Sequence, residues 1–383
     1  MRLRFAGFEL DLDARELRSD GEIVALQPQV FALLAYLVEH RDRAVAKAEL
    51  LERLWPDAVV TEASLQRAMS LLRTALGDAG KTAIRTVAKH GYRFVAPVEG
   101  ADPTTLAMDT PRYARSGGVH VAWTTIGTGA IDVVLVLPWA FPMRALLDEE
   151  HTRAFVGELA QLGRVVLFDK RGTGQSDRVK AIQDLDERVG DLLAVIRAAG
   201  SRRAIVVGWS EGAPLAVELS ARHPELVAGL VLVGGFPVMA AREDFVWGWT
   251  PARVDELRSY IASAWGRGAT LVACVPAGAV TPAIESWARQ VEQSGASPGA
   301  ALDLLEMNLR VDVRARLAEL AMPVTLLHAH DDRVIDPECS RRMARSIPAA
   351  TLELVPGDDH LLVFRHRGVF LSHLRRTIDA ASR

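Results

Sequence analysis

The chain has 383 residues, which is long for one domain and predicts two. Hydrophobic residues make up 49% of it, enough for a large core. The net charge of −3 gives no indication of a polyanionic partner, so a site for one must be sought in local charge clusters. Two cysteines without a C-x-x-C spacing argue against a disulfide framework and against a cysteine zinc site, and we expect no metal and no cofactor. No secretion signal and no apolar run of membrane-spanning length is found, so we expect a soluble, cytoplasmic protein.

The N-terminal quarter alternates short apolar runs with turn signals and then shows helical periodicity. Asp20-Gly21, between two apolar runs, is a hairpin signal, and the periodic segments that follow have a proline near one start and a glycine at one end. This order of elements is that of a winged helix. The expected elements are a small antiparallel sheet over residues 1–26, helices over about 28–39, about 47–54 and from Thr61 to a stop at Gly77, and a hairpin of residues 84–87 and 92–95.

Residues 1 to about 98 resemble the DNA-binding output domain of the OmpR/PhoB type, which implies binding to double-stranded DNA. In response regulators a phosphoacceptor domain precedes this module. Here we expect none, and we expect the input signal to come from the C-terminal side. The motifs that carry the resemblance are Leu26-x-Pro28, Phe31-x-Leu33-Leu34, Glu49-Leu50-Leu51, Leu54-Trp55, Leu71-Leu72-Arg73-x-x-Leu76-Gly77-Asp78, Ile84-Arg85-Thr86-Val87 and Gly91-Tyr92-Arg93-Phe94.

The third helix is predicted to carry a polar, basic face opposite its apolar stripe. Such a face enters a major groove, whereas cations on the hairpin would contact phosphate or the minor groove. The alternative is a solvated helix face on a winged helix that binds protein, and Arg73 and Arg93 can also be partly structural. The candidate DNA-binding residues are Gln66, Arg67, Ser70, Arg73 and Thr74 on the helix and Arg85, Lys89, His90 and Arg93 on the hairpin.

After an expected linker over residues 99–111, continuous apolar strands alternate with helices. This pattern predicts a mostly parallel sheet covered on both faces, so the fold class is α/β with a winged helix in front. The expected strands are residues 119–123, 132–137, 165–169, 205–207, 230–233, 324–328 and 351–355.

Residues 112–383 resemble the α/β-hydrolase fold. Asp169 to Asp177, D-K-R-G-T-G-Q-S-D, is a turn typical of that family, and Gly208 to Gly212 reads G-x-S-x-G. The likeness is greatest to hydrolase-like domains that bacteria fuse to cyclases and to winged-helix regulators. Segments that match this subgroup are Trp287, Ala296-Ser297-Pro298-Gly299 and Asp312-Val313-Arg314.

The G-x-S-x-G stretch lies between an apolar strand and a helix, which is the context of a nucleophile elbow. Its glycines let strand and helix pass closely, while Ser210 is expected in a strained conformation with its hydroxyl exposed. The backbone N–H of Glu211 would then supply half of an oxyanion hole. We therefore expect Ser210 to be the nucleophile of a serine hydrolase.

A serine hydroxyl needs a base, and the family order is serine, acid, histidine. His360 follows the last predicted strand and is the candidate base. Asp332 follows the preceding strand and is the candidate acid, with Asp331 as the alternative because Ala329 replaces the family's glycine. The acid would fix the histidine tautomer and stabilise the imidazolium. His328 and His330 are expected to be structural.

The second oxyanion donor is expected in the loop after residue 137, from the backbone N–H of Ala140 or of Trp139. Family members often carry His-Gly where this chain has Pro-Trp, and a bulky Trp139 could narrow the hole. An inserted helical lid is expected over about residues 236–320. Of its four tryptophans, at residues 247, 249, 265 and 287, we expect two or three to be lid core.

The pocket is expected to be apolar, with Trp139 and Trp209 in its wall. Such a pocket fits a small ester, thioester or lactone, or a hydrophobic signal that is not hydrolysed. Three hypotheses remain: a one-component transcription regulator with a sensor of hydrolase fold, a serine hydrolase with an accessory winged helix, and a catalytically silent receptor. A homodimer is compatible with each of them, and no membrane partner is expected.

Overall fold

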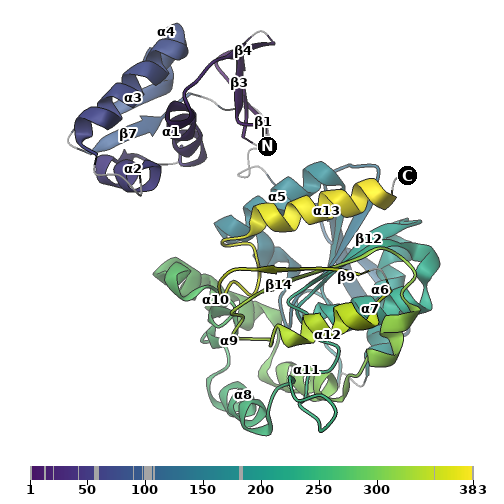
Figure 1. The fold of residues 1–383 in the computed structure, drawn as a ribbon. Helices are drawn as coiled ribbons and strands as arrows, with labels where there is room; N and C mark the ends of the chain where they lie inside the picture. Colours follow the sequence, from purple (N-terminus) through teal and green to yellow (C-terminus); the bar gives the residue numbers. More distant parts are fainter. Residues whose placement is uncertain are drawn as a thin grey trace. The chain divides into compact units, whose positions relative to one another are not determined.

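A computed structural model describes residues 2–12, 14–19, 21–41, 43–55, 60–88, 90–96, 98, 106, 108–180, 184–348 and 350–381 (Figure 1). Asp20, Lys89 and most of the expected linker lie outside these residues. The chain divides into two compact units, Met1–Thr105 and Leu106–Arg383. Among the described helices, none combines the length and apolar character that crossing a bilayer requires.

The N-terminal unit has the winged-helix order predicted from the sequence. A four-stranded antiparallel sheet, β1-β2-β3-β4, precedes the helices α1 to α4, and a second sheet of order β5-β7-β6 contains the C-terminal hairpin. The elements are β1 (Arg2–Phe5), β2 (Phe8–Asp11), β3 (Glu16–Ser19), β4 (Glu22–Val24), α1 (Pro28–Glu39), β5 (Val45–Ala46), α2 (Lys47–Leu54), α3 (Glu62–Ala75), α4 (Gly77–Ala83), β6 (Ile84–Val87) and β7 (Gly91–Phe94).

The apolar stripes of α1 and α3 form the core of this unit, as their periodicity predicts. Phe5 of β1 meets Phe94 of β7 edge to face at 5.0 Å, which joins the two sheets. The short helix α4 is absent from the prediction. Gly77, at φ +57°, turns the chain out of α3, and Gly80 then packs so closely on α3 that a Cβ would lie 2.4 Å from the Arg73 carbonyl oxygen.

The C-terminal unit is built on an eight-stranded sheet of order β15-β14-β13-β12-β10-β11-β9-β8. Strand pairs are parallel from β15 to β11, and β9 and β8 pair antiparallel at the other edge. β8 is missing from the sequence prediction. The strands are β8 (Arg112–Ser116), β9 (Val119–Ile126), β10 (Asp132–Val136), β11 (Arg164–Phe168), β12 (Ala204–Trp209), β13 (Val227–Val233), β14 (Val324–Ala329) and β15 (Thr351–Val355).

Both faces of this sheet are buried. Figure 1 shows α5 and α13 on one side and α6, α7 and α12 on the other. Alternate residues of one strand therefore enter different cores: Val206 packs with α7, whereas Ile205 and Val207 pack with α5 and α13. The helices are α5 (Glu150–Leu162), α6 (Leu185–Ala198), α7 (Gly212–Arg222), α12 (Glu338–Ser346) and α13 (Arg367–Ala381).

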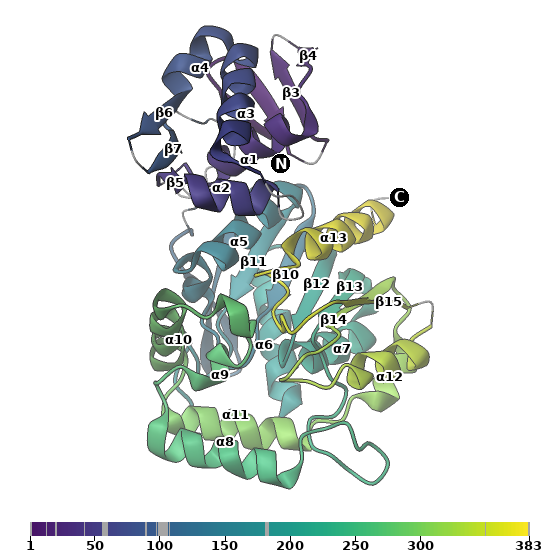
Figure 2. The same ribbon diagram turned by 60° about the vertical axis from the view of Figure 1, so that its left-hand side comes forward.

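Helices also fill the long connection between β13 and β14. Figure 2 shows α8 and α11 side by side, with α9 and α10 next to them. This group forms a lid at one end of the sheet. The lid helices are α8 (Pro251–Ala264), α9 (Ala269–Val272), α10 (Pro282–Gly295) and α11 (Pro298–Arg310).

Candidate active site

The turn between β12 and α7 has the geometry of a nucleophile elbow. Ser210 has φ +53°, a left-handed conformation that is costly for a residue with a side chain. The two flanking glycines allow the close passage: a Cβ at Gly208 would lie 2.7 Å from that of Ala216, and one at Gly212 would lie 2.1 Å from the carbonyl oxygen of Val136. The turn thus presents Ser210 at the carboxyl end of β12.

Three predicted residues meet at the carboxyl ends of β12, β14 and β15. His360 Nε2 lies 2.8 Å from Ser210 Oγ, and His360 Nδ1 lies 2.6 Å from Asp332 Oδ2. With the proton on Nδ1, the imidazole donates to Asp332 and accepts from the Ser210 hydroxyl. This is the arrangement in which a histidine can remove a serine proton.

Asp332 is held by further donors. The backbone N–H groups of Val334 and Ile335 donate to its Oδ1 at 2.7 and 3.2 Å. His328 Nε2 lies 3.1 Å from Oδ2, so this buried histidine contacts the acid. Burial alone would raise the pKa of Asp332, but His360 and His328 outweigh it and lower the pKa, which keeps the carboxylate ionised.

The alternative acid, Asp331, lies away from this cluster. Its side chain is exposed and pairs with that of His330 at 2.7 Å. The geometry therefore supports Asp332 over Asp331.

The expected oxyanion loop makes a tight turn, in which the Phe141 N–H donates to the Pro138 carbonyl oxygen at 3.3 Å. Ala140 has φ +49°, so a second residue with a side chain adopts a left-handed conformation beside the site. A Cβ on Gly295, at the end of α10, would lie 1.9 Å from the Ala140 carbonyl oxygen. The lid therefore packs directly on this loop and helps to hold it.

Behind the elbow lies a cluster of buried charges that the sequence did not reveal. The Glu211 carboxylate accepts from Lys170 Nζ at 2.5 Å and from Asn308 Nδ2 at 3.0 Å, and it also pairs with the Arg188 guanidinium. Burial alone would raise the pKa of Glu211, yet the two cations lower it to about 2. Asp169, which is also buried, attracts Lys170 as well, so two cations and two acidic side chains are buried together behind Ser210.

Lys170 also ties the oxyanion loop to the elbow. Its ammonium donates to the carbonyl oxygens of Leu137 and Pro138, at 3.0 and 2.8 Å, as well as to Glu211. These carbonyls begin the loop that carries Ala140, and Glu211 directly follows Ser210. One buried side chain thereby connects the two segments expected to supply the oxyanion donors.

A cavity of about 340 Å³ adjoins these groups. Ser210, Glu211, Trp139 and Ala140 all lie in its wall. The lid supplies most of the rest, which is largely apolar. Further lining residues are Phe236, Met239, Trp249, Leu257, Tyr260, Trp265, Leu271 and Val291.

The tryptophans divide between cavity and core. Trp249 and Trp265 line the cavity, whereas Trp287 is buried with its Nε1 donating to the Ala145 carbonyl oxygen. Trp247 is partly buried, so one of the four lid tryptophans is fully core and not the two or three expected. Trp209 does not line the cavity, which corrects the expectation for that residue. It follows Ile205 and Val207 on the same strand face and packs at 5.5 Å from the ring of Phe155 in the opposite core.

The candidate DNA-binding face of α3 is exposed at Gln66, Arg67, Ser70 and Thr74. Arg73 is half-buried instead: its Nη2 donates to the Ile84 carbonyl oxygen at 2.9 Å and to Thr86 Oγ1 at 3.0 Å. It therefore joins α3 to β6.

On the hairpin, Arg85 and His90 are exposed. Arg93 is half-buried, and its Nε donates to the Arg41 carbonyl oxygen at 3.4 Å. Both Arg73 and Arg93 thus have structural contacts, as the sequence allowed. Lys89 is outside the described residues.

Comparison with known families agrees with both units. A family profile described as serine aminopeptidase, S33, matches residues 150–365, more than half of the chain. The chain belongs to the serine aminopeptidase S33 family. A second profile, described as transcriptional regulatory protein, C terminal, matches residues 21–94, in the winged helix. Both resemblances predicted from the sequence are thereby confirmed.

Curated relatives of this S33-family chain include esterases. It is 27% identical over 275 residues to a pimeloyl-acyl-carrier-protein methyl ester esterase of Nitrosospira multiformis, covering 68% of this chain and 98% of that protein. It is 28% identical over 211 residues to a bifunctional esterase/perhydrolase of Acinetobacter calcoaceticus, covering 51% and 75%. An esterase structure from Exiguobacterium antarcticum superposes with a TM-score of 0.64 at 21% identity, covering 70% of this chain and all of that one, which shows the shared fold.

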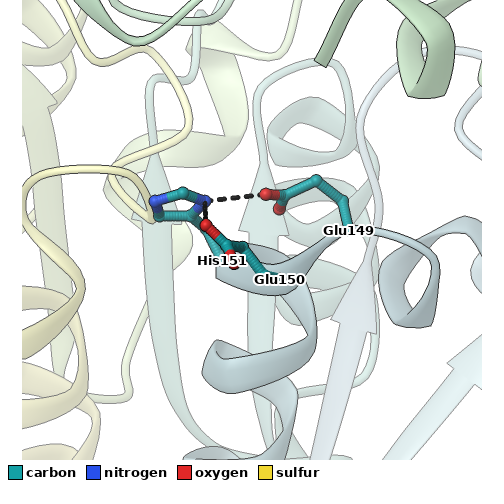
Figure 3. A group of neighbouring side chains, drawn as sticks. All are labelled: Glu149, Glu150 and His151. Atoms are coloured by element: carbon teal, nitrogen blue, oxygen red, sulfur yellow. Dashed lines mark hydrogen bonds and ion pairs between the residues drawn. The ribbon is translucent and has the colours of Figure 1, made fainter. Parts of the chain in front are cut away.

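One group in the S33-family unit has the composition of a metal site. Figure 3 shows His151 between Glu149 and Glu150 at the start of α5, with its Nδ1 2.7 Å from Glu149 and 3.9 Å from Glu150. The Glu149 side chain also accepts from the Thr152 N–H at 2.9 Å, as a helix cap does. Capping and one ion pair account for this arrangement, so we assign it no ligand.

Proposed function

We propose that this chain is a one-component transcription regulator. Its winged helix would bind double-stranded DNA, and its α/β-hydrolase domain would bind and hydrolyse a small apolar ester, thioester or lactone. The observation that carries the proposal is the hydrogen-bonded series Ser210–His360–Asp332 at the wall of an apolar cavity, in the same chain as a winged helix. A DNA-binding domain in the same chain as such a site favours the interpretation that the compound bound in the cavity controls transcription.

In the proposed reaction, His360 Nε2 accepts the proton of Ser210 as Oγ attacks the carbonyl carbon. Asp332 stabilises the imidazolium, and the N–H groups of Glu211 and Ala140 bind the oxyanion. Collapse of the tetrahedral intermediate breaks the bond to the leaving group, which takes the proton from His360, and leaves an acyl-Ser210 ester. Water, deprotonated by His360, then releases the acid and restores Ser210.

The contacts of Lys170 support this assignment, because its ammonium joins the start of the Ala140 loop to Glu211 and so helps to fix both expected oxyanion donors. The competing function is a silent receptor. It is favoured by Trp139, which stands where family members often carry glycine and which stacks on Trp265 with ring centres 6.5 Å apart.

The proposal also assigns residues to DNA. Gln66, Arg67, Ser70, Arg73 and Thr74 would face the major groove, and Arg85, Lys89, His90 and Arg93 would contact phosphate or the minor groove. It takes residues 1–98 as the DNA-binding domain, 99–111 as a linker and 112–383 as the sensor, with a lid over about 236–320, in a cytoplasmic protein. If the protein is a homodimer, its half-sites should be about one helical turn apart.

Incubation with a fluorophosphonate, followed by intact-mass measurement, tests the nucleophile. The proposal expects one adduct per chain for the wild type and none for Ser210→Ala. Asp332→Asn should reduce ester turnover by about 10⁴-fold, because the histidine would lose its orienting carboxylate. Absence of any wild-type adduct would refute the hydrolase and leave the receptor, for which ligands would be sought by thermal shift.

DNA binding is tested separately by selecting sequences from a random pool with the full chain. Selection of a common motif, lost when salt is raised, is expected for major-groove recognition with phosphate contacts. No enrichment at low salt would contradict a DNA-binding role and favour a protein partner for the winged helix.

A further inference from the structure

The cavity next to Ser210 contains few polar groups that are free to meet a ligand. The Glu292 carboxylate accepts five hydrogen bonds, from the backbone N–H groups of residues 266, 268 and 270 and from the hydroxyls of Thr270 and Tyr260. Burial raises the pKa of the Cys274 thiol well above its ordinary value, so the thiol stays neutral. The Glu211 side chain is occupied by its buried cations. Arg253 and Glu256 are the remaining charged residues among the described lining.

Arg253 is a half-buried cation whose hydrogen-bonding capacity is largely unused within the described residues. Its guanidinium lies over the Trp249 ring, with Cζ 4.5 Å from the ring centre. One nitrogen, Nη2, donates to the Arg333 carbonyl oxygen at 2.9 Å. A guanidinium has five N–H donors in a planar fork, so the Trp249 stack fixes its plane while most donors remain available.

Acidic neighbours do not neutralise this cation by contact. Glu256, three residues along α8, is exposed and acts on Arg253 by weak electrostatic attraction, without an ion-pair contact among the described residues. Asp332 is within electrostatic range but is taken up by His360 and His328. A wholly apolar ligand would therefore strip water from the Arg253 guanidinium without replacing its hydrogen bonds, which costs free energy.

We infer that Arg253 binds a free carboxylate of the ligand. The substrate class becomes an ester, thioester or lactone of an apolar acid that carries a second, ionised carboxyl group, such as a half-ester of a dicarboxylic acid. The reacting carbonyl lies at Ser210, the apolar chain runs along the tryptophan-lined wall, and the carboxylate pairs with the planar guanidinium, which can bind both of its oxygens. This inference rests on the proposed site at Ser210 and adds the chemistry of its substrate.

The test compares monoethyl esters of linear dicarboxylic acids with ethyl esters of monocarboxylic acids of equal length. The quantity measured is the ratio of kcat/KM for the two classes. We expect the wild type to favour the half-ester, and Arg253→Met to reduce that ratio by about 10- to 100-fold, as loss of a hydrogen bond to a charged group does. Arg253→Lys should restore part of the ratio, because it keeps the charge but not the fork.

Arg258→Met is the matched control on the same helix. Its guanidinium pairs with Glu306 and Asp255, and it does not line the cavity, so the ratio should stay at the wild-type value. An Arg253→Met ratio equal to that of the wild type would overturn the inference. So would a wild type that shows no preference for the half-ester.

A binding measurement separates this inference from the hydrolase proposal. Calorimetric titration of Ser210→Ala with the half-ester, with and without Arg253→Met, needs no turnover. If fluorophosphonate fails to label Ser210 but Arg253→Met still weakens binding by about 10-fold or more, the carboxylate site stands and the hydrolase fails. If Ser210→Ala binds the half-ester with the same Kd with and without Arg253→Met, the carboxylate site is refuted, whatever the labelling shows.

Discussion

Replacing Gly295 by alanine should impair the site without touching any reacting group. Gly295 ends α10, and a Cβ there would lie 1.9 Å from the Ala140 carbonyl oxygen, 3.1 Å from its carbonyl carbon and 3.3 Å from Pro142 Cδ. The first distance is far inside van der Waals contact, so the oxyanion loop or the lid must move by on the order of 1 Å. The neighbour is backbone, so no side-chain rotation can relieve the clash.

The expected loss follows from that displacement. Misplacing a catalytic group by about 1 Å costs roughly 100-fold in rate, and removing one oxyanion donor costs about 10²- to 10³-fold in kcat. We therefore expect Gly295→Ala to lower kcat/KM for a p-nitrophenyl ester by about 100-fold. Fluorophosphonate labelling should slow with it, because the same donors stabilise the phosphonylation transition state.

The control is Gly299→Ala in the first turn of α11, where no heavy atom lies within 4 Å of an added Cβ. It should keep wild-type kcat/KM. Thermal melting of both variants checks that each is folded. A folded Gly295→Ala with wild-type kcat/KM would refute the role given to the Ala140 loop.

The buried ions and the exposed face of α3 lend themselves to three further tests. Lys170→Met should lower the free energy of unfolding by about 3 kcal/mol in a urea titration, because it leaves buried Glu211 short of a cation; an unchanged urea midpoint would contradict that pairing. The pKa of Glu211 is about 2 in the folded chain against 4.5 for a free glutamate, so its contribution to stability is present above pH 4.5 and is lost as the pH falls toward 2. Glu211→Gln should flatten the decline of Tm across that window, and parallel Tm curves would rule the carboxylate out. Arg67→Ala should weaken DNA binding and lower the slope of log affinity against log salt by about 0.9, while Arg4→Ala, whose arginine pairs with Glu9 on the N-terminal sheet, should not; equal slopes for wild type and Arg67→Ala would remove α3 from the interface.

Local rules were enough to find the three candidate catalytic residues. Ser210, Asp332 and His360 each follow a strand of the parallel part of the sheet, and parallel strands present their carboxyl ends at one edge of the sheet. The choice between Asp331 and Asp332 stayed open because Ala329 replaces the glycine from which the family's spacing is counted. The packed structure separates the two, because Asp332 is buried against His360 and His328 while Asp331 is exposed and pairs with His330.

Trp209 could have been placed correctly from the sequence. It lies two and four residues after Val207 and Ile205 on the same strand, so its side chain points to the same face as theirs. All three side chains enter the core on the α5 and α13 side. Because Trp209 precedes Ser210 in the chain, we expected it to line the pocket, but consecutive residues of a strand point to opposite faces.

The ion cluster behind the elbow could not be placed from sequence. Lys170 and Arg188 are 41 and 23 residues from Glu211, and no periodic pattern connects such positions. The remaining signal was a glutamate inside a motif flanked by buried apolar segments, where an ionised side chain requires a partner. Which cations pair with Glu211 depends on how three segments pack together: the turn after β11, helix α6 and the elbow.

The hydrogen bonds to Glu292 bear on how quickly a molecule can enter and leave the cavity. They draw on α8, the turn after it and α9, and they end on α10, so no one of these segments can swing open alone. We expect the lid to open as one body, and a molecule in the cavity to leave only as often as that collective step occurs. Changes in ligand concentration that are shorter than this residence time would then leave the occupancy of the cavity unchanged. If the chain is the regulator proposed above, it would respond to sustained exposure to its ligand and not to brief pulses.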